Sequence, residues 1–204
     1  MVQLFFDGGG FMWPILGIFI IGLVFVIERL MHLIKGMGLD ETFAYGLSDE
    51  IENNDLNGAI AECQSKKGPV ANLCLSALER ADKGPKEAQA ALENVGSIEM
   101  ASLEKNMTWI SLCIATAPML GFLGTVWGMI QAFNDIKAAN DISPAVVAGG
   151  ISVALLTTAF GLVVAIVLQL FQNTCLYIID NQIVTMQKST TMLLNAIGKG
   201  NLKK

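Results

Sequence analysis

Three stretches of this sequence contain no Asp, Glu, Lys or Arg: Gly8–Ile27 with 20 residues, Asn106–Asn134 with 29 and Ile142–Ile179 with 38. A helix that crosses a hydrocarbon core of about 30 Å needs roughly 20 apolar residues. The first stretch is just long enough to cross, and the other two exceed what a bilayer requires. The sequence therefore predicts an all-α membrane protein with three transmembrane helices.

The composition excludes several classes of protein. Charged residues make up 15% of the chain, against about 25% in soluble domains, so too few are present to cover the surface of an ordinary soluble enzyme. The net charge of −5 offers no basic patch for nucleic acid. The four cysteines lack the spacing of metal ligands. We expect no enzymatic activity, no cofactor and no permanent metal.

The placement of Lys and Arg predicts the orientation. No Lys or Arg precedes Arg29, and the segment 135–141 contains only Lys137, whereas 28–105 contains eight. Positive charges favour the cytoplasmic side, so the N-terminus and the loop 135–141 should lie outside. Because the positive charges follow the first apolar stretch, that stretch is interpreted as a retained helix and not a cleaved signal. In a bacterium this predicts a multi-pass protein of the inner membrane.

The chain divides into four predicted parts. These are the periplasmic N-terminus with the first transmembrane helix (1–35), a cytoplasmic helical segment (36–105), the second and third transmembrane helices with the short periplasmic loop 135–141 (106–180), and a cytoplasmic C-terminal helix and tail (181–204).

Apolar residues at helical spacing predict further helices outside the membrane. Three short helices are expected around residues 39–51, 56–60 and 70–77, and a fourth pattern at 88–98 continues into the second transmembrane helix without a breaker. The third transmembrane helix continues past Asp180 into the tail. Together these helices are expected to form a cytoplasmic collar.

Small residues recur on one face of each long apolar stretch. They are Ala117, Gly121, Gly124 and Gly128 in the second, and Gly150, Ala154 and Gly161 in the third. Thr125, Thr157 and Thr158 lie beside them, and Pro118 interrupts the backbone hydrogen bonding. Such faces often serve only helix packing, and a threonine can hydrogen-bond a carbonyl of its own helix.

A polar stripe along two paired helices nevertheless requires a lumen or a partner helix beside it. Gln169, Gln172 and Asn173 extend that stripe. Neither long stretch contains an ionisable Asp, Glu, Lys or Arg. If these helices conduct ions, the charged group must come from another chain.

The run from Ala117 to Ile130, with its Gly121-Phe122-Leu123-Gly124-Thr125-Val126-Trp127-Gly128 core, strongly resembles the signature of the ExbB/TolQ/MotA family of ion-driven motor subunits. The run from Gly150 to Leu162 resembles the last helix of that family, and Val26-Ile27-Glu28-Arg29-Leu30 resembles the end of its first helix. Size and predicted topology resemble ExbB or TolQ more than the longer, four-span MotA.

The resemblance implies a homopentamer that encloses the single transmembrane helices of two ExbD- or TolR-like partners. An aspartate of the partner would carry the ion, and the partner's periplasmic domain would transmit work to the envelope. Thr125 and Thr158 match the family's threonines that face this aspartate. The small, uncharged faces would suit the wall of such a lumen.

One position departs from the resemblance. ExbB and TolQ usually carry a glutamate five residues before the second threonine, where this chain has Val153. The run around Thr157 and Thr158 resembles PomA, the sodium-driven flagellar stator subunit. Threonine hydroxyls at 125 and 158 could ligate Na⁺ transiently. Proton-driven MotA also lacks the glutamate, so both ions stay open, with sodium slightly favoured.

Two other functions are compatible with the sequence. A stand-alone cation channel or transporter would usually show inverted repeats or broken helices with internal charges, and neither is recognisable here. A structural membrane scaffold would make the hydroxyl stripe incidental.

Overall fold

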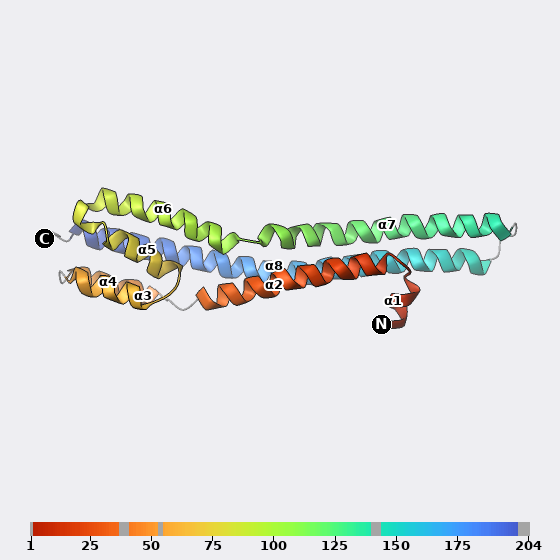
Figure 1. Cartoon of the computed structure of the whole chain (residues 1–204), viewed down its shortest axis with the longest axis horizontal. Helices are drawn as coiled ribbons and strands as arrows, with labels where there is room; N and C mark the ends of the chain where they lie inside the picture. Colours follow the sequence, from red (N-terminus) through yellow and green to blue (C-terminus); the bar gives the residue numbers. More distant parts are fainter. Residues whose placement is uncertain (1, 37–40, 53–54, 140–143, 200–204) are drawn as a thin grey trace. The chain divides into compact units, whose positions relative to one another are not determined.

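A computed structural model describes residues 2–36, 41–52, 55–139 and 144–199, and every regular element among them is a helix (Figure 1). In chain order these are α1 (Val2–Asp7), α2 (Met12–Gly36), α3 (Glu41–Glu52), α4 (Leu56–Ser65), α5 (Pro69–Leu78), the 3₁₀ helix η1 (Ala81–Lys83), α6 (Pro85–Glu104), α7 (Met107–Ala139) and α8 (Pro144–Lys199). Three segments are long and apolar enough to cross a membrane. The predicted all-α membrane protein is confirmed.

The chain forms two compact units, each assembled from separate stretches of sequence. The first, which we call the span unit, contains residues 1–29 and 106–174. The second, the charged unit, contains residues 30–105 and 175–204. Each unit is described by itself below.

In the span unit, α2 packs against both α7 and α8. A β-carbon at Gly22 would lie 2.7 Å from a methyl carbon of Leu168 and 3.3 Å from the Cβ of Cys113, so glycine allows these side chains to approach the backbone of α2 closely. The rings of Phe25 and Trp109 stack with centroids 6.1 Å apart and planes inclined by 8°. These contacts bury one side of α2 and leave apolar side chains such as Val24 exposed, as expected for a helix that faces lipid.

The short helix α1 was not predicted from the sequence. Its Phe5 makes edge-on ring contacts with Trp13 of α2 and Phe160 of α8, with centroids 5.3 Å and 5.7 Å apart. A six-residue helix is marginal by itself. One of the ring contacts of Phe5 is with Phe160, far along the chain, and local sequence patterns do not reveal such a contact.

In the charged unit, α3, α4 and α5 are the three short helices that the sequence predicts. Their predicted apolar residues Leu47, Ile51, Val70, Leu73 and Ala77 are buried. Local signals set the ends of these helices. The side chain of Asp55 caps α4 by accepting a hydrogen bond from the Gly58 N–H at 2.9 Å, and proline opens both α5 and α6.

The expectation that the pattern at 88–98 continues unbroken into the second transmembrane helix is wrong. Helix α6 ends at Glu104, and α7 begins at Met107. Between them Asn106 adopts a left-handed backbone with φ 65°, a conformation that asparagine tolerates better than most residues. Its Nδ2 donates to Glu28 Oε2 at 2.9 Å. A long-range side-chain contact thus accompanies a break that contains neither glycine nor proline.

Helix α7 continues to Ala139, so residues 135–139 of the predicted loop 135–141 are helical. Its last turn contains two alanines, which favour helix, and Lys137, whose charge suits the C-terminal end of the helix dipole. Residues 140 and 141 lie outside the described part of the chain.

Candidate functional site

The small residues of α7 and α8 lie against one another within a single chain. A β-carbon at Gly124 would lie 2.6 Å from Thr157 Oγ1, and one at Gly161 would lie 2.6 Å from the backbone oxygen of Ala117. Gly128 is similarly close to Ala154, at 3.3 Å from its Cβ. The two backbones therefore approach as closely as packing between membrane helices allows.

The same contact includes the remaining small residues predicted from the sequence. A β-carbon at Gly121 would lie 2.9 Å from the Thr157 carbonyl oxygen, and one at Gly150 would overlap Ala132. Pro118 is half-buried inside α7, which continues on both sides of it. The structure thus assigns these residues to the contact between α7 and α8. A role in lining a lumen stays a prediction.

The three threonines differ in what surrounds them. Thr157 is 1% exposed, and its hydroxyl donates to the Ala154 carbonyl at 2.8 Å, so it is buried and satisfied. Thr158 is half-buried and donates to the Gly121 carbonyl of α7 at 3.2 Å. Thr125 is also half-buried and donates to the Phe122 carbonyl of its own helix.

Thr125 and Thr158 lie on the same edge of the α7–α8 pair. The hydrogen bond from Thr158 places its hydroxyl beside Gly121, and Thr125 follows Gly121 by four residues, one helical turn along the same face. We call this the polar edge. Two hydroxyl groups thus lie along one edge of helices whose uncharged stretches contain no Asp, Glu, Lys or Arg.

The polar edge continues along both helices. On α7, Ser111 precedes Thr125 by fourteen residues, close to four full turns, and therefore lies on nearly the same face. Its hydroxyl accepts a hydrogen bond from Gln172 Nε2 of α8. On α8, Gln169 Nε2 donates to Asn173 Oδ1 at 3.0 Å and to Gln172 Oε1 at 3.3 Å.

The three amide residues Gln169, Gln172 and Asn173 differ in how far their side chains are exposed. Gln172 is 8% exposed, whereas Gln169 and Asn173 are exposed. The polar stripe predicted from the sequence, at positions 169, 172 and 173, does not include Ser111. The spacing of Ser111 from Thr125 was the available signal for it.

Val153 lies apart from the residues of the polar edge. It is half-buried, and a β-carbon at Gly9 would lie 3.4 Å from its Cγ1. This residue therefore packs beside the chain that leads into α2. At that place a carboxylate would be close to the backbone of Gly9, and valine fills the space with two methyl groups.

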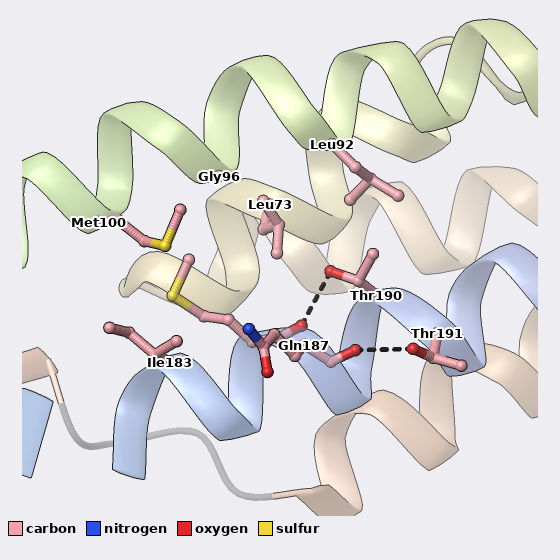
Figure 2. A pocket seen from close by; sticks show the side chains of 9 residues that line it. Leu73, Leu92, Gly96, Met100, Ile183, Gln187, Thr190 and Thr191 are labelled. Atoms are coloured by element: carbon pink, nitrogen blue, oxygen red, sulfur yellow. Dashed lines mark hydrogen bonds between the residues drawn. The ribbon is translucent and has the colours of Figure 1, made fainter. Parts of the chain in front are cut away.

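The charged unit contains a cavity of about 260 Å³ between α5, α6 and α8 (Figure 2). Its lining is mainly apolar and includes Leu73, Leu92 and Met100. The two hydroxyls at its edge are satisfied, since Thr190 donates to the Met186 carbonyl at 2.8 Å and Thr191 to the Gln187 carbonyl at 2.9 Å. No convergent set of free polar groups marks this cavity as a catalytic site.

Two buried thiols of the charged unit, those of Cys63 and Cys74, are held in the protonated form. Burial raises the pKa of the Cys63 thiol to about 12, with the carboxylates of Glu62 and Glu50 adding to the effect. Burial and the neighbouring Cys63 raise the pKa of Cys74 to about 12. Thiols held in the protonated form are weak nucleophiles and weak metal ligands. In the described part of the chain, no three His, Cys, Asp or Glu side chains could together hold a metal ion.

Comparison with known proteins agrees with the resemblance of the motifs. The chain is 31% identical over 169 residues to a protein of Methanothermobacter thermautotrophicus named as an ExbB homolog of biopolymer transport, covering 82% of this chain and 60% of the relative. It is 30% identical over 186 residues to an ExbB-like biopolymer transport protein of Synechocystis, covering 90% and 88%. The biopolymer transport protein ExbB of Neisseria gonorrhoeae is 34% identical over 125 residues, covering 54% and 57%.

The family pattern covers most of the chain, from residue 65 to residue 188. That range contains α7, most of α8 and every residue of the polar edge. The protein belongs to the MotA/TolQ/ExbB proton channel family.

Proposed function

We propose that this protein is an ExbB/TolQ-like subunit of a motor of the bacterial inner membrane that is driven by an ion gradient. Five copies would form a ring around a dimer of a single-span, ExbD/TolR-like partner. An aspartate of the partner would carry the ion past the polar edge, and the partner would transmit mechanical work to the envelope. The names of the relatives, which concern biopolymer transport, support an output in transport energisation.

The polar edge is the observation that carries this proposal. The Thr158 hydroxyl bonds across to the Gly121 carbonyl of α7, and Thr125 lies one helical turn beyond Gly121, on helices whose apolar stretches contain no Asp, Glu, Lys or Arg. A neutral polar surface can solvate an ion or a protonated carboxyl group without binding it permanently. One charge that crosses 100 mV releases about 2.3 kcal/mol, which is sufficient to drive a conformational step in a partner.

Among the two ions, we propose Na⁺ as the coupling ion. Hydroxyl oxygens are suitable ligands for a hard cation. Position 153, where ExbB and TolQ usually carry a glutamate, holds a valine that packs beside Gly9, so this chain lacks a proton-accepting group there.

The test is voltage-driven uptake of Na⁺ into vesicles that contain the protein and a single-span, ExbD/TolR-like partner. Replacing Thr158 with Val should lower the uptake at least about tenfold, because the half-buried hydroxyl is lost from the polar edge, while the number of chains in the ring stays unchanged. Thr174→Val is the matched control. Thr174 is exposed on α8 and donates to the Leu170 carbonyl of its own helix at 2.9 Å.

The other possible outcomes would change the proposal in different ways. Uptake by the protein without its partner would favour a stand-alone cation channel. No ion flux under any condition would favour a scaffold. Partner-dependent uptake of protons in the absence of Na⁺ would keep the motor and overturn the choice of ion. Equal uptake by wild type and Thr158→Val would show that the Thr158 hydroxyl has no role in ion transport.

A further inference from the structure

The amide nitrogen of Gln169 lies at a point where two neutral oxygen atoms converge. Its Nε2 donates one hydrogen to Asn173 Oδ1 at 3.0 Å and the other to Gln172 Oε1 at 3.3 Å. The hydrogens of an amide carry partial positive charge, so two oxygens that face this group create a place that favours positive charge. Gln169 occupies that place in this structure.

The orientation of these oxygens follows from a chain of hydrogen bonds. The Ser111 hydroxyl donates its one hydrogen to the Met107 carbonyl at 3.2 Å, so it can only accept from Gln172. Gln172 must then present its NH₂ group to Ser111 and its carbonyl oxygen to Gln169. Gln172 is 8% exposed, and these two hydrogen bonds define the direction of its amide group.

The location of the group favours an ion over a purely structural role. Gln169 and Asn173 are exposed although they belong to an uncharged stretch. Leu168, the residue before Gln169, contacts Gly22 of α2, which is still inside the first apolar stretch. Exposed amides at this level are costly against lipid and favourable beside water or an ion.

We propose that Gln172 Oε1 and Asn173 Oδ1 form a weak binding site for a dehydrated or partly hydrated monovalent metal cation such as Na⁺, and that Gln169 competes for these oxygens. Neutral amide oxygens ligate hard cations, whereas they bind protons hardly at all near neutral pH. The site is therefore selective for a metal cation over a proton. Weak binding is suited to a site on an ion pathway, because a transported ion must also dissociate. Its role in transport rests on the proposed motor function, but the binding itself does not.

The experiment measures cation binding by the purified protein without a partner. Infrared difference spectra are recorded while NaCl replaces N-methylglucamine chloride, and the carbonyl band of the Gln and Asn side chains is followed. We expect a saturable shift of this band. Asn173→Leu should abolish it. Gln169→Leu should instead strengthen Na⁺ binding about fivefold, because one competing neutral hydrogen bond is removed.

The opposite signs of the two variants make the test decisive. A group that only packs α7 against α8 would give no Na⁺-dependent band, or the same Na⁺ affinity in both variants, and either result overturns the proposal. Gln131→Leu removes an exposed amide of α7 outside this group and should leave the shift unchanged. A gain of affinity in Gln169→Leu cannot arise from misfolding, so the test holds even if Asn173→Leu folds poorly.

The result is separable from the proposed motor function. Na⁺ binding without partner-dependent flux would retain the site and reject the motor. Partner-dependent Na⁺ flux with no carbonyl shift would retain the motor and reject the site.

Discussion

At the scale of single residues, the direction of a side chain decides its role more than its chemical type does. Thr157 and Thr158 are adjacent and identical, yet the first is buried with its hydroxyl bonded inside α8, and the second bonds across to α7 from the polar edge. Successive residues on a helix point about 100° apart. The sequence predicts that small residues and threonines share a region of the helix, but the partner surface for each depends on how α7 and α8 are rotated.

The contact between α7 and α8 gives a prediction at Gly161. A β-carbon there would lie 2.6 Å from the backbone oxygen of Ala117, which cannot move aside as a side chain could. Gly161→Ala should therefore lower the free energy of unfolding by about 1–3 kcal/mol. The measurement is thermal unfolding in detergent, followed by circular dichroism.

Gly149→Ala is the matched control for Gly161→Ala, since a β-carbon at Gly149 would have no atom within 4 Å. It should leave the stability unchanged or slightly higher, because alanine favours helix. Equal stabilities of the two variants would mean that α7 and α8 do not approach this closely.

At the scale of helices, the sequence predicts that a helix is present more reliably than it predicts where the helix begins and ends. The patterns for α3, α4 and α5 are periodic and bounded by glycine, proline or asparagine, and the structure has a helix at each. The break before α7 was not predictable in this way, because it depends on Asn106 bonding to Glu28, 78 positions earlier. A tertiary contact decides that boundary, and local propensity does not.

The break before α7 gives a prediction that distinguishes the effect of the backbone conformation of Asn106 from the effect of its side-chain hydrogen bond. Asn106→Gly keeps a residue that tolerates φ 65° but loses the bond to Glu28, whereas Asn106→Ala loses both. The alanine variant should be less stable than the glycine variant by about 1 kcal/mol. Chemical unfolding in a mild detergent measures the difference. Asn94→Ala, at an exposed position of α6, is the control, and equal losses in the two Asn106 variants would contradict a left-handed Asn106.

At the scale of the whole molecule, two units are assembled from alternating stretches of one chain. The distribution of charge predicts which stretches belong together, because residues 1–29 and 106–174 hold the apolar segments and the remainder holds most of the charges. The sequence does not show that each unit has its own core. That property depends on contacts between residues more than a hundred positions apart.

The polar edge predicts how the whole molecule behaves in isolation. A row of half-buried hydroxyl groups and exposed amides on helices that cross a membrane requires cover from other chains, so the purified protein should form a ring. Native mass spectrometry should show a complex with five times the chain mass of 21.9 kDa. The Thr158→Val ring should have the same mass, and a stable monomer at high concentration would contradict the ring.

The close contact of α7 and α8 also determines which positions can change during evolution. At Gly161 the β-carbon of any larger residue would meet the backbone oxygen of Ala117, so substitutions at this position are disfavoured. Gln169 and Asn173 are exposed on the surface of α8, so each can be exchanged without displacing a backbone. A lineage could therefore acquire a different ion preference by a few substitutions along the edge while the wall behind it stays the same.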